Sequence, residues 1–160
     1  MVTKGIEYEV AELLEQKQLH VTTAESCTGG LIAGTLVNVA GISAWFEEGY
    51  VTYSNASKEK LLGVSHQTLE AYGAVSQQTA EEMAVGAAKA AKADTAISAT
   101  GIAGPDGGTE EKPVGLVYFG CFCKGETCVE KHIFTGDRAQ IRAQSVQAAL
   151  TLLKTMLENV

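Results

Sequence analysis

The sequence predicts an α/β fold, a three-layer α/β/α sandwich with a mixed, mostly parallel sheet. Segments with helical spacing of apolar residues alternate with short β-prone runs over the first two-thirds of the chain. Two later β-prone runs, residues 114–123 and 127–134, are joined only by Lys124-Gly125-Glu126, which predicts an antiparallel pair. With 160 residues, 46% of them hydrophobic, the chain can bury one sizeable core. We therefore expect a single domain over residues 1–160.

Helices and strands are predicted to alternate in the first part of the chain. One amphipathic helix should open the chain and end near Leu19, and a second should begin after residue 30. Their apolar positions are Ile6, Val10, Leu13 and Leu14, then Leu31, Ile32, Leu36 and Val37. Residues 21–24 and 45–53 are β-prone and are predicted strands. A short helix over about residues 56–62 should end at Gly63.

The remaining elements are predicted from helix-capping residues and from stripes of small or apolar residues. Ser76 can cap a long helix with a narrow stripe of small residues, which implies close packing on a sheet. The stripe comprises Ala80, Met83, Ala84, Ala87, Ala88 and Ala91. Residues 95–100 form a predicted buried strand that runs into the glycine-rich loop 101–108. Asp137 and Gln140 resemble a capping box for the last helix. Its apolar face is Val146, Ala149, Leu150, Leu153 and Leu157.

Charge and hydropathy exclude several classes of protein. The formal net charge is −7, and no cluster of Lys or Arg supplies the electrostatic attraction on which nucleic-acid binding depends. Apolar stretches are interrupted well before the roughly 20 residues that span a bilayer. Residues 1–19 carry acidic charges where a signal peptide would be basic. We expect a cytoplasmic protein without nucleic-acid or membrane partners, and its small-residue stripe and exposed apolar residues are compatible with a homo-oligomer.

The four cysteines are too few for a disulfide scaffold. Cys121, Cys123, Cys128 and His132 could together surround a zinc ion. However, the alternation of Cys121 and Cys123 also fits one face of a strand, and the sequence contains no CxxC knuckle. Reduced, buried thiols are therefore the favoured interpretation, and we expect no metal.

Two segments follow predicted strands, where open α/β folds bind their ligands. In residues 24–30, Ser26 is a candidate nucleophile at a strand-to-helix turn. The amides of Thr28, Gly29 and Gly30 could stabilise an oxyanion there. In the second segment, residues 101–108, the glycines allow exposed amides suited to an anionic or carboxamide-bearing ligand.

A serine nucleophile needs a base. His20, His66 and His132 lie outside both segments, so a histidine-based triad is weakly indicated. Lys58 and Lys60 follow the predicted strand that ends at Tyr53-Ser54-Asn55, and either could reach Ser26 if burial lowered its pKa. Tyr53 could orient the base. A Ser-x-Thr-Gly-Gly turn is more often a helix cap, and a glycine-rich loop is most often only a turn. The patterns alone therefore predict an α/β protein with a ligand loop.

Several strings along the chain resemble one known family in wording and in order. They are TAESCTGG (23–30), YSNASKEKLLGV (53–64), GAVS (73–76), ATGIAGPDGGTEEKPVG (99–115) and GDRAQIR (136–142). Together they span most of the chain, and they resemble the CinA C-terminal domain family. Because fused members carry an additional N-terminal domain, a chain of 160 residues resembles the free-standing form. Ser57 stands where alanine is commoner in the family, a departure that leaves the register of the lysine intact.

The resemblance implies an amidohydrolase that deamidates nicotinamide mononucleotide to nicotinic acid mononucleotide and ammonia. Ser26 would be the nucleophile and Lys58 its general base, with Tyr53 and Thr28 assisting by hydrogen bonding. No cofactor or metal is implied. The pyridine nucleotide would be bound by Gly29, Gly30, Thr100, Gly101, Ile102, Ala103, Gly104, Gly107, Gly108 and Arg142.

Three other interpretations remain open. A thiol is intrinsically the better nucleophile, so Cys27 competes with Ser26, although only one of two adjacent side chains can face the pocket. A nucleotide-binding or regulatory module without turnover would keep the same fold. The combined presence of Ser26, Tyr53 and Lys58 argues against such a module. A phosphate-binding, kinase-like domain ranks last because GxxxxGK[ST] is absent.

Overall fold

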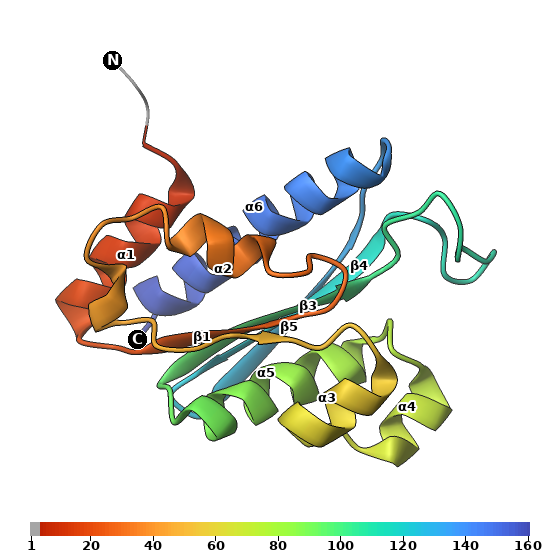
Figure 1. Ribbon diagram of the computed structural model, residues 1–160, viewed down its shortest axis with the longest axis horizontal. Coiled ribbons are helices and arrows are strands. Elements are labelled where there is room, and N and C mark those ends of the chain that lie inside the picture. The colour runs from red at the N-terminus through yellow and green to blue at the C-terminus, as the bar shows by residue number, and fades with distance from the viewer. Residues whose placement is uncertain (1–3) are drawn as a thin grey trace.

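The computed structural model describes residues 4–160, so the first three residues of the expected domain and of its acidic N-terminal segment lie outside it. One sheet forms the centre, with strands in the order β2-β1-β3-β4-β5 (Figure 1). The strands are β1 (Val21–Glu25), β2 (Tyr50–Val51), β3 (Thr95–Gly101), β4 (Leu116–Cys123) and β5 (Glu126–Ile133).

Strand direction confirms the mixed sheet. β1 pairs in parallel with both β2 and β3, whereas β4 pairs antiparallel with β3 and with β5. β5 therefore runs in the same direction as β3, and only β4 is reversed. The β4–β5 hairpin was predicted, and its register places Cys123 opposite Glu126 across the tight turn.

Helices cover both faces of the sheet, which confirms the three-layer sandwich (Figure 1). One face carries α1 (Ile6–Lys17), α2 (Leu31–Leu36) and α6 (Arg138–Glu158). The other carries α3 (Asn55–Leu62), α4 (His66–Tyr72) and α5 (Gln77–Ala91). Within residues 4–160, none of these helices combines the length and the apolar character that a bilayer crossing requires.

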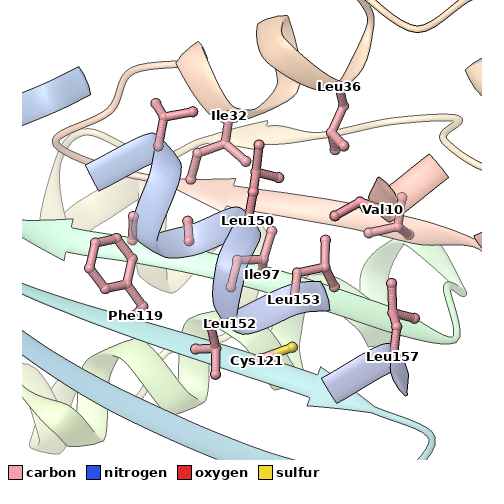
Figure 2. Packing of buried hydrophobic residues seen from close by; sticks show 14 of the residues in the cluster. Val10, Ile32, Leu36, Ile97, Phe119, Cys121, Leu150, Leu152, Leu153 and Leu157 are labelled. Carbon is pink, nitrogen blue, oxygen red and sulfur yellow. The ribbon is translucent and has the colours of Figure 1, made fainter. Parts of the chain in front are cut away.

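The larger core lies between α6 and the sheet. Ile97 and Phe119 project from the strands towards Leu150 and Leu153 of α6, and all four side chains are buried (Figure 2). The predicted apolar face of the last helix is buried throughout, and its capping box at Asp137 is present. Burial of such side chains supplies the main driving force for folding.

A second core lies under α5, where the predicted stripe of small residues packs on the other face of the sheet. Ala80, Met83, Ala84 and Ala87 are fully buried, and Ser76 caps the helix as predicted. Small side chains bring the helix so near that a Cβ at Gly120 of β4 would overlap with the Ala80 carbonyl. α5 also approaches the end of α3, because a Cβ at Gly86 would overlap with the carbonyl oxygen of Leu62.

We expect Gly86→Ala to lower the free energy of unfolding by about 1–3 kcal/mol, because the added methyl forces α3 and α5 apart. Gly34→Ala is the matched control, since Gly34 is also helical and has open space at its Cβ position. That substitution should raise stability by up to about 1 kcal/mol through helix propensity. Urea denaturation measures both, and equal stability of the two variants would contradict the close α3–α5 contact.

The structure differs from the predictions in two places. The predicted strand 45–53 contains only the two-residue β2, preceded by a 3₁₀ helix (Ile42–Ala44) and an isolated bridge from Phe46 to Val21. The hydroxyl of Thr22 donates to the Glu48 carbonyl, so a side chain holds this stretch where a strand ladder was expected. The helix α4 was not predicted, although Ser65 caps its first turn.

Candidate active site

Ser26 directly follows the carboxyl end of β1. Its backbone N–H donates to the Ala99 carbonyl of β3 at 2.9 Å, so the residue is tied to the centre of the sheet. The N–H of Gly29 then donates to the Ser26 carbonyl at 3.0 Å and closes a tight turn. Gly29 and Gly30 have φ of 56° and 101°, a left-handed conformation that glycine adopts without strain. The sequence TAESCTGG thus places a hydroxyl between two buried strands and α2.

Lys58 reaches Ser26 from α3. Ser54 and Ser57 form a capping box that starts this helix, and Lys58 lies in its first turn with a side chain only 1% exposed. The amine Nζ lies 3.0 Å from Ser26 Oγ and 3.0 Å from the Thr52 carbonyl oxygen. No acidic side chain of residues 4–160 forms an ion pair with it.

Burial lowers the pKa of Lys58 below its ordinary value of 10.5, because the buried ammonium loses its hydration. The proximity of the Cys27 sulfur opposes this shift but is the smaller influence. A neutral amine can accept a proton, and the lowered pKa increases the neutral fraction of the amine at a given pH. Lys60, the other candidate base, is exposed to solvent on the same helix.

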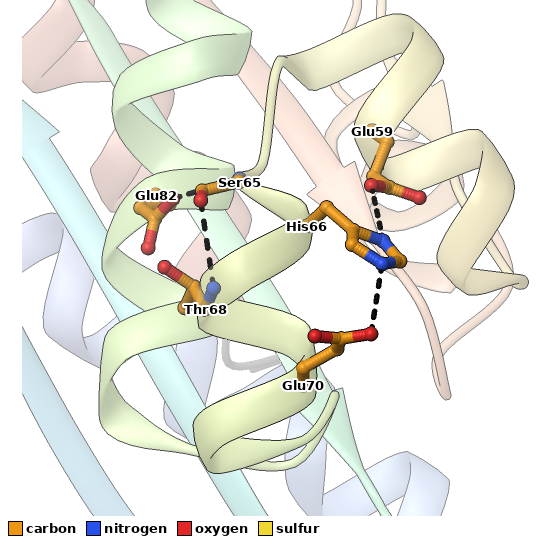
Figure 3. A network of polar contacts seen from close by, with 6 residues as sticks. All are labelled: Glu59, Ser65, His66, Thr68, Glu70 and Glu82. Carbon is orange, nitrogen blue, oxygen red and sulfur yellow. Dashed lines mark hydrogen bonds and ion pairs between the residues drawn. The ribbon is translucent and has the colours of Figure 1, made fainter.

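The histidines do not take part in this arrangement. His66 is exposed to solvent, and its ring nitrogens lie 3.0 Å from Glu59 and 3.0 Å from Glu70 (Figure 3). Nearby, the Ser65 backbone donates to Glu82 of α5, so this network ties α4 to both α3 and α5.

Ser26 and Lys58 open into a cavity of about 190 Å³. Of the residues expected in the site, it is lined by Ser26, Tyr53, Lys58, Thr100, Gly101 and Ala103. Cys27, weighed as the competing nucleophile, also lines it. The other lining residues, which we did not predict, are Asn55, Ala74, Val75 and Arg138. Asn55 and Arg138 lie within the motifs YSN and GDR, so their position in those motifs was the available signal.

Arg138 joins two sides of the cavity. Its guanidinium donates to the Gly104 carbonyl at 2.7 Å and to the Tyr53 hydroxyl at 3.1 Å. Tyr53 is 64% exposed, so this pair lies where the cavity meets solvent. Gly104 therefore contacts the site through its carbonyl, although it does not line the cavity. A permanent positive charge therefore stands at the opening of the cavity.

Cys27 is poorly suited to act as a nucleophile. Its thiol is buried, and burial raises its pKa to about 11, with the neighbouring Glu25 adding to the rise. A group with that pKa is a thiol at neutral pH, whereas the reactive form of cysteine is the thiolate. The pocket therefore favours Ser26 over Cys27.

Several residues expected in the site, one as a catalytic residue (Thr28) and the others as nucleotide ligands, do not line the cavity. They are Thr28, Gly29, Gly30, Ile102, Gly107, Gly108 and Arg142. The amide of Gly29 is used within the turn, and the amide of Ile102 donates to the Leu116 carbonyl. Thr28 is fully buried, and its hydroxyl has no hydrogen-bond partner within the described part of the chain. Gly107 and Gly108 lie in an exposed section of the loop.

The free amides at the N-terminus of α2 are bound by a side chain of the same chain. The carboxylate of Glu25 accepts hydrogen bonds from the amides of Ile32 at 2.8 Å and Ala33 at 3.0 Å. Helix N-termini attract anions, and here the anion is a fully buried side chain from β1. This role of Glu25 was not predicted from the sequence.

The remaining cysteines belong to the core. Cys121 and Cys123 are buried on β4, and Cys128 faces Cys121 from β5. Burial raises the pKa of both Cys121 and Cys123, which keeps them as thiols. Among residues 4–160, no three His, Cys, Asp or Glu side chains are grouped so that they could hold a metal ion.

Comparison with known proteins identifies close relatives. The family model of the CinA C-terminal domain matches residues 3–157. A nicotinamide-nucleotide amidohydrolase PncC of Enterobacter agglomerans is 54% identical over 153 residues, which cover 94% of this chain and 93% of the relative. A competence-damage inducible protein of Clostridioides difficile (strain 630) is 54% identical over 98% of this chain, which spans only 37% of that relative's length.

Solved structures resemble this fold closely. A CinA superfamily protein from Klebsiella pneumoniae superposes with a TM-score of 0.93 at 37% identity, covering 97% of both chains. A competence/damage inducible protein from Agrobacterium tumefaciens gives a TM-score of 0.89 at 43% identity, covering 99% of both.

Proposed function

The chain belongs to the CinA C-terminal domain family, and on this premise we propose that it hydrolyses the carboxamide of nicotinamide mononucleotide to give nicotinic acid mononucleotide and ammonia. The observation that carries the proposal is the 3.0 Å contact between Ser26 Oγ and Lys58 Nζ beside a cavity. A relative named for this activity and matched over nearly its whole length supports the choice of substrate.

In the first half of the proposed reaction, Ser26 becomes acylated. The neutral amine of Lys58 takes the proton of Ser26 Oγ while this oxygen attacks the carboxamide carbon. The tetrahedral intermediate collapses, its C–N bond breaks, and the leaving nitrogen receives the proton from Lys58. Ammonia departs, and the acyl group of nicotinic acid mononucleotide remains as an ester on Ser26.

Water completes the reaction. Lys58, neutral again, takes a proton from a water molecule that attacks the ester carbon. The bond to Ser26 Oγ breaks, the oxygen recovers its proton from Lys58, and nicotinic acid mononucleotide is released. These steps use only side chains and water, so the proposal requires no metal and no cofactor.

The size of the cavity suggests how the nucleotide lies. At about 190 Å³ it is smaller than the roughly 300–1,000 Å³ of pockets that enclose whole small-molecule ligands. We infer that it holds the pyridine ring and carboxamide, while the ribose and phosphate extend towards solvent. Arg138 lies at this opening, and a guanidinium binds phosphate oxygens well. Tyr53 is placed to pack beside the nucleotide.

The competing proposal is a nucleotide-binding module without turnover. Purified protein incubated with nicotinamide mononucleotide distinguishes the two when ammonia and nicotinic acid mononucleotide are both quantified. We expect the two products in equal amounts. Binding of the nucleotide without either product would favour the module and reject the hydrolase.

We expect kcat/KM to rise with pH and then level off, with a midpoint below 10.5. Only neutral Lys58 accepts a proton, so activity should rise as the pH increases through the pKa of this amine. Because burial lowers that pKa, the midpoint should lie below 10.5. A pH–rate profile of wild type measures the midpoint. The Cys27→Ala profile is the control, because loss of the ascending limb in that variant would assign it to the thiol.

We also propose that the protein acts in the cytoplasm as a homo-oligomer. The acidic net charge of −7 and the four free thiols fit the cytosol. Large apolar side chains remain exposed at Val37, Val51 and Ile133, and such residues are suited to contacts between subunits.

A further inference from the structure

We propose that Arg142 is a positioning residue, which holds Ser26 at the correct distance from Lys58 without touching the substrate. The inference rests on the proposed serine hydrolase function, but not on which amide is hydrolysed. It also gives Arg142 a different role from the nucleotide contact that the sequence led us to expect.

The contacts of Arg142 carry the proposal. From the second turn of α6, its Nε donates to the Cys27 carbonyl at 3.0 Å, and its Nη2 donates to the Thr28 carbonyl at 3.1 Å. These carbonyls directly follow Ser26 in the chain. The planar guanidinium presents its donors in a fixed arrangement, so the two contacts set both the position and the orientation of the turn.

The turn needs such support. Gly29 and Gly30 both have left-handed backbone conformations, and glycine has more conformational freedom than any other residue. Backbone hydrogen bonds from Gly29 to the Ser26 carbonyl and from Leu31 to the Thr28 carbonyl close the turn, and the Ser26 amide attaches only its beginning to Ala99 of β3. Arg142 attaches it to α6, whose length and buried face make it a rigid support.

Glu25 provides the matching attachment on the other side. Its buried carboxylate binds the amides of Ile32 and Ala33, which fixes the start of α2 to β1. Residues 26–30 therefore lie between two charged anchors of opposite sign. The carboxylate of Glu25 accepts from backbone N–H groups that follow the turn, and the guanidinium of Arg142 donates to backbone carbonyls within it. Each charge therefore meets the end of the peptide dipole that has the opposite sign.

Arg138 offers an internal comparison. It lies one helical turn before Arg142 on α6, yet it lines the cavity and binds Tyr53, whereas Arg142 does neither. A substrate contact and a positioning contact thus lie on the same helix. Removing the first should mainly raise KM, and removing the second should mainly lower kcat.

The experiment measures Arg142→Met and Arg142→Lys with two readouts. One is kcat and KM for nicotinamide mononucleotide, and the other is the rate at which an alkyl fluorophosphonate labels Ser26. In labelling, the Oγ–P bond forms, the P–F bond breaks, fluoride leaves and Lys58 takes the proton. We expect Arg142→Met to lower kcat and the labelling rate about 10- to 100-fold, with KM nearly unchanged. Lysine should restore part of the loss, since its amine can bind one carbonyl.

Arg138→Met is the matched control, for which KM should rise. If Arg142→Met instead raises KM and leaves the labelling rate unchanged, Arg142 binds the nucleotide and our proposal is overturned. Should the methionine variant not fold, as judged by circular dichroism, Arg142→Lys decides, because it keeps the charge and the stem. If the wild-type protein is labelled but does not release ammonia, only the proposed substrate is rejected. The labelling rates of the variants then still test the role of Arg142. A wild type that is not labelled rejects both proposals.

Discussion

Ser26→Ala is expected to abolish ammonia release from nicotinamide mononucleotide, with kcat reduced by about 10⁴-fold or more. Without Oγ no acyl ester can form, and Lys58 loses the hydroxyl that lies 3.0 Å from its amine. The removed atom is small and borders the cavity, so the fold should be retained. A coupled ammonia assay measures the rate, and mass spectrometry of a quenched wild-type reaction should detect the ester of nicotinic acid mononucleotide on Ser26.

Cys27→Ala is the control for this experiment, because the adjacent thiol lines the same cavity. Its pKa of about 11 keeps it protonated, so its removal should leave most of the activity. The reverse outcome, an active Ser26→Ala and an inactive Cys27→Ala, would transfer the role of nucleophile to the cysteine.

Lys58→Met should lower kcat by about 10²- to 10⁴-fold, the usual contribution of a general base. Methionine fills much of the space of the buried lysine stem, so the variant should fold and still bind the nucleotide. Stopped-assay turnover and nucleotide binding by calorimetry separate the two effects.

Lys60→Ala is the matched control on the same helix, since Lys60 is exposed and does not line the cavity. We expect it to behave as wild type. Activity lost from Lys60→Ala and kept in Lys58→Met would mean that the wrong lysine has been assigned as the base.

Elements that depend on neighbouring residues in the chain were predicted well. Ser76 and the Asp137–Gln140 pair cap their helices, and Gly63 ends α3 with a φ of 67°. Each of these features is a local hydrogen bond or a backbone conformation, and both are encoded within a few residues. The strand expected over residues 45–53 failed because its hydrogen bonding is decided by distant groups such as the Thr22 hydroxyl.

The candidate site was likewise predicted where nearby residues decide the structure and was missed where distant packing decides it. The candidate nucleophile and the lysine could be named from the sequence, but pattern alone left Lys58 and Lys60 equal. Only the orientation of α3 separates them, because it buries one and exposes the other. Arg142 was expected near the nucleotide and Arg138 was overlooked, since residues four apart share a helix face and the sequence does not say what each one meets.

The surroundings of Lys58 also affect the release of product from the proposed active site. The amine contacts two uncharged oxygens, Ser26 Oγ and the Thr52 carbonyl. When the second half-reaction ends, the proton of Lys58 has returned to Ser26 Oγ, and the new carboxyl group lies beside this amine and the negative end of a backbone dipole. Burial disfavours the ammonium form of Lys58, so the product carboxylate is held less tightly there than it would be beside a permanent cation. The burial that favours the neutral, proton-accepting form of the lysine therefore also favours product departure.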